Sequence, residues 1–297
     1  MELSKEFKEK VVQAVVESRK NFGGSDAAFS KTIGIGGSIF SRLKNGEIEG
    51  LLSESKWLDI AIQLGVSPNQ RAWNMAETDV FKAIQSDVEF CQAYSKGMIL
   101  VDDCAIGKTY SAKYLAKTRT NCFYLDASQT KTKQLFIRRF ARTIGVDDKG
   151  KYAEVKERLK YSLKVLESPV IIIDEAGDLD YNAFLELKEF WNATEGQCGW
   201  YLMGADGLRA KIERGMNHKK VGFREIFSRY SDKYMNIVPT ARDQRIDFYK
   251  KLITDVVSVN TKDKTIINNI VKRCLTSDAS GEIGGLRKAE TLLIMNR

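Results

Sequence analysis

Histidine, proline and paired cysteines are scarce in this sequence of 297 residues. His218 is the single histidine, and the five cysteines stand far apart without a CxxC pair: Cys91, Cys104, Cys122, Cys198 and Cys274. This pattern argues against a disulfide framework and against a zinc site, and it fits a reducing cytoplasm. It also disfavours mechanisms that need one histidine as a base and another as a metal ligand. We expect His218 to be a solvated loop residue.

Long apolar runs are also missing. No stretch approaches the ~20 consecutive apolar residues that a membrane-spanning helix needs. The N-terminal segment carries apolar residues such as Phe7 and Val11 at helical spacing and lacks the small-residue cleavage site of a signal peptide. Hydrophobic residues make up 43% of the chain and charged residues 29%, which are ordinary values for a globular protein. We therefore expect a soluble, cytoplasmic protein with no membrane segment.

The net charge of +8 is distributed unevenly. Residues 1–70 carry nine basic and nine acidic side chains, whereas residues 108–142 carry nine basic side chains against the single acid Asp126. The nine are Lys108, Lys113, Lys117, Arg119, Lys131, Lys133, Arg138, Arg139 and Arg142. Such a surplus attracts polyanions. The alternative is a solvated face that acids from elsewhere in the fold balance.

Short apolar runs alternate with helical patterns in the middle of the chain. The runs cover residues 97–101, 122–125, 170–173, 200–203 and 234–238. Five strands with intervening helices predict a three-layer α/β domain around a largely parallel sheet. After Pro239 the spacing is helical, which predicts a small helical lid. The expected domains are 1–70, a helical linker at 71–96, a core at 97–238 and a lid at 239–297.

Residues 25–46 have the pattern of a helix-turn-helix within an all-α domain. Gly34 would supply the turn, the small Ala28 would let the two helices cross closely, and Leu43 would help Ile39 to bury the second helix. The residues left on its other faces are Ser38, Ser41, Arg42 and Lys44. The pattern resembles phage repressors, in which the second helix reads the DNA major groove. Because the domain has no net charge, a protein-docking bundle is the alternative.

A phosphate-binding loop is predicted between an apolar strand and a helix. Gly107 lets backbone amides face a phosphate, Lys108 can reach the β- and γ-phosphates of ATP, and Thr109 can bind Mg²⁺. The pattern GxxxxGK[ST] has glycine where this chain has Asp102, so an extra carboxylate beside the phosphates or backbone strain could weaken nucleotide binding. The expected nucleotide-binding residues are Asp102, Asp103, Cys104, Ala105, Ile106, Gly107, Lys108, Thr109 and Tyr110.

A second motif follows the apolar run at 170–173, which ends in Asp174 and Glu175. At the carboxyl edge of a sheet, Asp174 can hold Mg²⁺ together with Thr109, and Glu175 can polarise the attacking water. The roughly 65 residues that separate Lys108 from this strand leave room for a strand and helices between the motifs. The two motifs together predict an ATPase that uses ATP and Mg²⁺.

These motifs resemble the Walker A and Walker B boxes of AAA+ ATPases, and three later segments are similar to further landmarks of that family. Asp206 stands where the family carries its polar sensor 1. Arg229 lies in a segment that resembles the SR box, which implies an arginine finger. Arg287 lies in a segment similar to sensor 2, which implies a contact with the γ-phosphate. The resemblance implies a P-loop AAA+ sandwich in which Lys108, Asp174 and Glu175 also act in catalysis.

A helix-turn-helix before a short AAA+ core resembles, in domain order, the phage Mu B transposition proteins, which are related to the IstB and TnsC target-selecting ATPases. The resemblance implies ATP-dependent binding to double-stranded DNA as a homo-oligomeric filament or ring that recruits and stimulates a DDE-type transposase. It implies DNA contacts after the second strand, at Lys131, Thr132, Lys133, Arg138 and Arg142. The alternative is a helicase loader or a nucleotide-sensing regulator, whose helix-turn-helix is the sole DNA contact or a partner's docking site.

Overall fold

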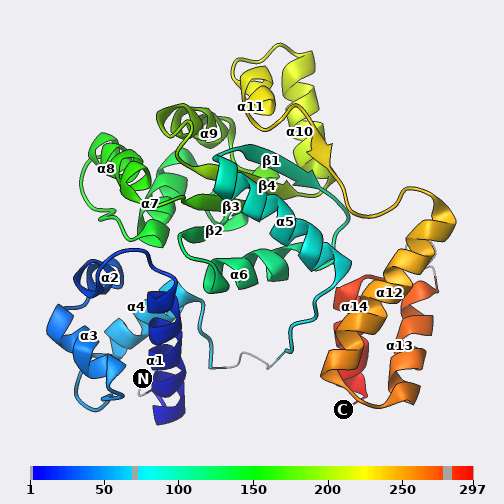
Figure 1. The fold of residues 1–297 in the computed structure, drawn as a ribbon, viewed down its shortest axis with the longest axis horizontal. Coiled ribbons are helices and arrows are strands. Elements are labelled where there is room, and N and C mark those ends of the chain that lie inside the picture. Colours follow the sequence, from blue (N-terminus) through cyan, green and yellow to red (C-terminus); the bar gives the residue numbers. More distant parts are fainter. Residues whose placement is uncertain (1–2, 69–72, 277–282, 297) are drawn as a thin grey trace.

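The computed structural model describes residues 3–68, 73–276 and 283–296. Five parallel strands form one sheet in the order β2-β3-β4-β1-β5 (Figure 1). The strands are β1 Gly97–Val101, β2 Cys122–Asp126, β3 Val170–Asp174, β4 Gly199–Gly204 and β5 Tyr234–Met235. The parallel sheet expected from the apolar runs is confirmed. The fifth strand ends before Val238 because the backbone amides of Ile237 and Val238 donate to the side chain of Asp102.

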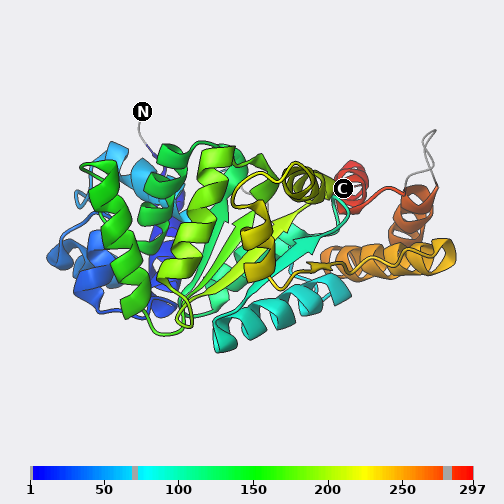
Figure 2. The same ribbon diagram turned by 90° about the horizontal axis from the view of Figure 1, so that it is seen from above.

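Helices cover both faces of the sheet (Figures 1 and 2). Successive side chains of a strand point to opposite faces, so Ile99 and Leu100 of β1 belong to different halves of the core. One half contains side chains from α7 Lys133–Ile144, α8 Tyr152–Val165, α9 Tyr181–Ala193, α10 Asp206–Asn217 and α11 Phe223–Arg229. The other half contains α5 Asp79–Tyr94 and α6 Lys108–Thr118. Burial on both faces explains why the strands are nearly continuous apolar runs.

Helix α5 is a layer of this sandwich, which corrects the expectation of a linker at 71–96. Its side chains Val80, Ile84 and Val88 are fully buried and belong to the same core half as Leu100. The helix is capped by Thr78, whose hydroxyl accepts from the backbone amide of Phe81 at 3.1 Å. The apolar stripe of α5 has helical spacing, and the sheet supplies the surface that it buries.

The predicted helical lid consists of α12 Arg242–Asn260, α13 Lys264–Leu275 and α14 Leu286–Met295. Tyr249, Leu252 and Ile253 of α12 continue the core half that contains α5. Asn260 accepts from the backbone amide of Asn74 at 2.9 Å. The lid therefore contacts the segment that leads into α5.

Helices α1 Lys5–Lys20, α2 Asp26–Thr32, α3 Gly37–Lys44 and α4 Glu54–Leu64 enclose a core of their own. The rings of Phe29 in α2 and Phe40 in α3 lie 5.4 Å apart, and Gly34 between the helices has a φ of 66°. Leu43 is fully buried, as expected. Ala28 is exposed, so the expectation that it lets the helices cross is wrong. The neighbouring Phe29 makes that contact instead, because it is the residue that faces α3.

The N-terminal helices dock on the α/β core through Asn121. The side-chain oxygen of Asn121 accepts from the amide of Gly23 at 3.1 Å, and its backbone amide donates to Asn21 at 3.1 Å. Gly145, with a φ of 90°, lies so close to Thr32 that a side chain at this position would collide with it. In Figure 2 the N-terminal helices and the lid lie at opposite ends of the α/β core.

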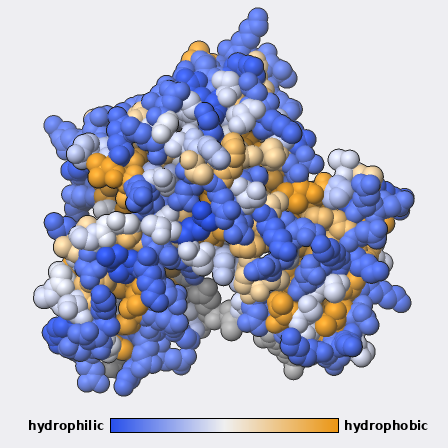
Figure 3. All heavy atoms as spheres, viewed as in Figure 1, coloured by the Kyte–Doolittle hydropathy of each residue, from blue (hydrophilic) through white to orange (hydrophobic). Residues whose placement is uncertain are grey.

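Hydrophilic residues cover most of the face drawn in Figure 3, and hydrophobic residues show in patches on the lid, on the α/β core and on the N-terminal helices. Among the residues that the structure describes, no helix combines the length and the apolar character that crossing a membrane requires. All five cysteines are free, and Cys104 is the exposed one.

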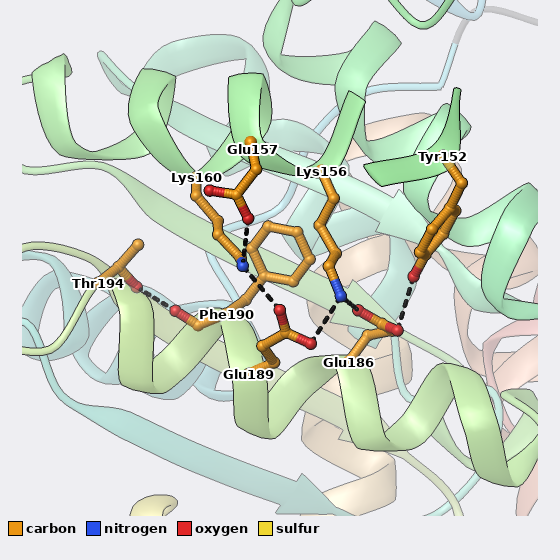
Figure 4. A network of polar contacts seen from close by, with 8 residues as sticks. All are labelled: Tyr152, Lys156, Glu157, Lys160, Glu186, Glu189, Phe190 and Thr194. Carbon is orange, nitrogen blue, oxygen red and sulfur yellow. Dashed lines mark hydrogen bonds and ion pairs between the residues drawn. The ribbon is translucent and has the colours of Figure 1, made fainter. Parts of the chain in front are cut away.

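An ionic network joins α8 to α9 (Figure 4). Lys156 bridges Glu186 at 3.2 Å and Glu189 at 2.6 Å, and Lys160 extends the network from Glu189. Glu186 is buried and also accepts from the hydroxyl of Tyr152 at 2.6 Å. Burial raises the pKa of Tyr152, so the phenol stays neutral and donates to the carboxylate. The network fixes the two helices that flank α7.

Tyr152→Phe should lower the free energy of unfolding by about 1 to 2 kcal/mol, because the buried oxygen of Glu186 loses a donor while the ring keeps its packing. Urea unfolding measures the change. The matched control is Tyr161→Phe on the same helix, where the side chain is exposed and the loss should be negligible. Equal effects of the two substitutions would contradict the role given to the network.

Candidate functional site

A cavity of about 490 Å³ lies where the predicted phosphate-binding loop, the segment before α5 and the lid meet. Its volume is typical of small-molecule sites. The loop and the start of α6 form one wall, Trp73 and Met75 lie on another, and Val256 and Leu286 come from the lid. Parts of the chain that are distant in sequence thus surround a single space.

The loop has the backbone shape that anion binding needs. Gly107 has a φ of 100° and Ala105 a φ of 58°, and α6 begins directly afterwards at Lys108. The amino end of α6 therefore faces the cavity, where unpaired amides and the helix dipole favour a phosphate. A side chain at Gly107 would be strained at this φ.

Lys108 is buried at the base of the cavity. Its ammonium donates to the backbone carbonyl oxygens of Asp102, at 2.8 Å, and Asp103. A bound phosphate would compete with these carbonyls for the same ammonium. The position is the one that the sequence pattern expects of the phosphate-binding lysine.

The side chain of Asp102 does not lie beside the cavity, which corrects one expectation. Its Oδ2 accepts from the amide of Val238 at 3.1 Å and from that of Ile237, and its Oδ1 accepts from the amide of Asp103 at 2.8 Å. The φ of Asp102 lies outside the left-handed region, so the strain considered for this position is absent. The carboxylate faces the junction between β5 and the lid because that junction offers donors.

Thr109, at the start of α6, contacts Asp174, the last residue of β3. The hydroxyl of Thr109 donates to Oδ2 of Asp174 at 2.6 Å, and Tyr124 donates to the same oxygen at 3.0 Å. Asp174 is buried, with 2% of its surface exposed. A hydroxyl and a carboxylate in contact suit Mg²⁺. The described residues hold no cluster of three or more His, Cys, Asp or Glu side chains, so phosphate and water would supply the remaining ligands.

Glu175 has an exposed side chain on the cavity wall and a left-handed backbone with a φ of 50°. Partial desolvation and the neighbouring Asp174 carboxylate raise the pKa of Glu175 above its ordinary value. The carboxyl group can accept a hydrogen bond from a water molecule in the cavity. This is the arrangement needed to orient water for attack on a phosphate.

Of the other catalytic residues expected from the family resemblance, the structure brings only Arg287 to this cavity. Arg287 lies in the first turn of α14 and lines the cavity from the lid. Asp206 begins α10 with an exposed side chain, and it is not among the described residues that line the cavity. A sensor role for Asp206 stays a prediction.

Arg229 lies at the other end of the sheet from the phosphate-binding loop. Its carbonyl oxygen is next to Gly97, the first residue of β1, whereas the loop follows the last residue. Its guanidinium donates to Asn192 at 2.7 Å and lies over the ring of Trp191 at 5.4 Å. Within one subunit Arg229 therefore does not reach the cavity. Its predicted role as a finger toward a neighbouring subunit stays a prediction.

Sequence reasoning missed Trp73, Met75 and Tyr124. The first two line the cavity, but they fall in the segment expected to be a linker, and their types alone give no signal. Tyr124 points from β2 toward the end of β3, and the parallel register of these strands places Asp126 opposite Asp174. Alternation along the strand could have placed Tyr124 on one face, but its partner Asp174 depends on the strand order.

The basic residues expected to bind DNA all have partners within the protein. Lys131 pairs with Asp178 at 3.4 Å, and Lys133 lies 4.9 Å from the ring centre of Tyr152. Arg142 pairs with Asp148 at 2.6 Å. Arg138 donates to the carbonyl oxygens of Asp148 and Gly150. Acids from elsewhere in the fold thus balance part of the basic surplus, as the alternative interpretation of the charge run expected. Thr132 lies immediately before α7 as its cap residue.

The expected recognition residues of α3 are Ser38, Ser41, Arg42 and Lys44, and all four are exposed. Arg42 pairs with Glu47 at 2.7 Å and Lys44 with Asp26 at 3.4 Å. Exposed ion pairs of this kind are weak, so they leave both basic side chains accessible to an anion.

The parallel sheet, the loop at the amino end of α6 and the acidic end of β3 are consistent with a P-loop AAA fold. Residues 92–212 match the family model described as an AAA domain, and the match supports an AAA+ ATPase family and nucleotide hydrolysis. The matched part includes Lys108, Asp174 and Glu175 and ends before Arg229 and Arg287. No curated protein matches the chain.

Lys108→Ala should abolish ATP binding, whereas Glu175→Gln should bind ATP and fail to hydrolyse it. The first substitution removes the phosphate contact and the second removes the carboxylate that orients water. Nucleotide-binding titrations and phosphate-release assays separate the two effects. Hydrolysis by Glu175→Gln at the wild-type rate would show that Glu175 has no such role.

Nucleotide binding should protect Cys104 from a maleimide reagent, because Cys104 is exposed and lines the cavity while the other four cysteines are buried. The rate of thiol labelling with and without Mg-ATP measures the protection. Cys104→Ser identifies the reacting thiol, and Lys108→Ala should label equally fast in both conditions. A labelling rate that saturating Mg-ATP leaves unchanged in the wild type would argue against this cavity as the nucleotide site.

Proposed function

We propose that this protein is an ATP-dependent DNA-binding ATPase of DNA transposition. In this proposal, the chain assembles with ATP as a filament or ring on target DNA and recruits a DDE-type transposase. One observation supports the coupling of ATP to DNA more than any other. Lys131, the first of the residues expected to contact DNA after the second strand, forms an ion pair with Asp178, and Asp178 lies just after Glu175.

The segment after Glu175 also contacts the backbone of Lys131. The amide of Asp180 donates to the carbonyl oxygen of Lys131 at 2.8 Å, so the segment after Glu175 and the loop after β2 are joined at two points. A rearrangement of Glu175 around the nucleotide would therefore change the position of Lys131. Lys131 could then turn toward a phosphate backbone, since its ion pair with Asp178 is exposed and weak, and Lys133 would leave the ring of Tyr152.

In the proposed reaction, each cavity residue has a separate task. ATP with Mg²⁺ supplies the phosphoanhydride that water cleaves. Lys108 binds the β- and γ-phosphates, Thr109 and Asp174 hold the metal ion, and Glu175 orients the attacking water. Arg287 contacts the γ-phosphate from the lid, and Arg229 of a neighbouring subunit would complete the site in the assembly.

The second candidate is a helicase loader or a nucleotide-sensing regulator in which α3 provides the only DNA contact. The pairing of Arg138 and Arg142 with the segment 148–150 favours this candidate, because these two guanidinium groups are already engaged. The exposed face of α3 would then read DNA or bind a partner. The two candidates share the ATPase site and differ in the surface that touches DNA.

Lys131→Ala with Lys133→Ala should weaken DNA binding in the presence of ATP, if the first proposal holds. A plot of log affinity against log salt should lose about 0.9 in slope for each lost phosphate contact. Fluorescence anisotropy with duplexes of unrelated sequence, with and without ATP, measures both effects. The matched control is Lys262→Ala with Lys264→Ala, an exposed pair in the lid at the same spacing.

The loader or regulator proposal predicts the reverse. Arg42→Ala with Lys44→Ala would then abolish binding, and the double change at Lys131 and Lys133 would leave it intact. Affinity that is indifferent to ATP in every variant would contradict the transposition-type mechanism.

A further inference from the structure

We propose that Asp102 and Asp103 are positioning residues that couple Lys108 to the lid, so that phosphate binding changes how firmly the lid is held. The proposal rests on the proposed function only in assuming that the cavity binds ATP. Neither carboxylate touches the cavity, and each is bound to a different part of the lid or its approach.

Asp102 holds the junction between β5 and the lid. Its buried carboxylate accepts from the amides of Ile237 and Val238, which follow β5 and precede α12. Glycine, the residue that the phosphate-loop pattern has here, would leave both amides without this acceptor. Val238 is itself buried, so water is a poor replacement. An aspartate at this position therefore ties the loop to the lid junction.

Asp103 holds the first lid helix. Its Oδ2 accepts from the hydroxyl of Tyr249 at 2.6 Å and pairs with the guanidinium of Arg245 at 2.5 Å. Both partners lie in α12. The neighbouring carboxylates of Asp102 and Asp103 thus attach the loop to two successive points, the junction and the helix that follows it.

The backbone of the same two residues holds Lys108. Its ammonium donates to their carbonyl oxygens, so one dipeptide binds the lysine through its backbone and the lid through its side chains. A phosphate that draws the ammonium away relaxes these carbonyls and shifts the carboxylates with them. The lid also meets the loop at its other end, where the amide of Leu286 donates to the carbonyl oxygen of Ala105 at 2.8 Å.

The test compares the full-length wild type with Asp102→Gly and Asp102→Asn by amide hydrogen exchange and ATP turnover. Without nucleotide, Asp102→Gly should lose protection at Ile237, Val238 and the first turns of α12. Asp102→Asn keeps one acceptor oxygen and should be intermediate. With a non-hydrolysable ATP analogue, Ile237, Val238 and the first turns of α12 should change their protection in the wild type and less in Asp102→Gly, because Asp103 still binds Tyr249 and Arg245 in that variant. The affinity of Asp102→Gly for the analogue should differ from that of the wild type by about tenfold, because a coupling between phosphate binding and lid attachment acts equally in both directions. Its turnover should fall as well.

Asp263→Gly is the matched control. This lid carboxylate also accepts from two backbone amides, those of Thr265 at 2.8 Å and Ile266 at 3.2 Å, but it caps α13 and is remote from the loop. It should leave turnover and the response of α12 to nucleotide at wild-type values.

The outcomes separate the two proposals. Wild-type exchange in Asp102→Gly, or a nucleotide response of wild-type size in it, overturns the coupling. A wild type that binds no ATP overturns the proposed function, and the comparison without nucleotide still decides whether Asp102 holds the lid.

Discussion

The hydrogen bond from Thr109 to Asp174, 2.6 Å long, joins the start of α6 to the end of β3, and the rest of the site depends on this arrangement. Helix α6 follows β1, which is separated from β3 in the sheet by β4. Parallel strands bring their carboxyl ends to one edge, and β4 ends there in Gly204, which has no side chain. Placing a hydroxyl against a buried carboxylate creates a ready pair of magnesium ligands, and it also sets Lys108 and Glu175 on the walls of one cavity.

The lid completes that cavity and is held to it by polar contacts from the loop itself. Leu286, Arg245 and Tyr249 meet the residues between β1 and α6, and Asn260 meets the segment before α5. Hydrogen bonds and exposed ion pairs of this kind are individually weak and can exchange partners. A ligand that alters the loop acts on these polar contacts, which lie beside the apolar side chains, such as Leu252 and Ile253, that pack the lid against the core half containing α5.

The basic side chains expected to bind DNA fall into two groups that differ in their contacts within the protein. Lys131 and Lys133 lie at the carboxyl edge of the sheet, near the segment after Glu175, and their contacts are an exposed ion pair and an aromatic ring. Arg138 and Arg142 lie farther along α7 and bind the segment 148–150. In the proposed mechanism, the first pair is the one that a nucleotide-dependent change releases. The net charge of +8 therefore overstates the number of cations that are available to a polyanion.

The strands, the position of Lys108 at the start of α6 and the acidic end of β3 could be predicted from the sequence, because each is a local pattern of apolar runs and turn residues. The rest depends on partners distant in the chain. Asp102 accepts from Val238, 136 residues away, so its pattern position wrongly suggested a carboxylate beside the phosphates. The segment of α5 was expected to be a linker, because the sequence does not show that the sheet buries its apolar stripe. The partners of Arg229 and Arg138 likewise depend on packing. The charge of a side chain indicates that it needs a partner, but the tertiary structure determines which groups lie near it.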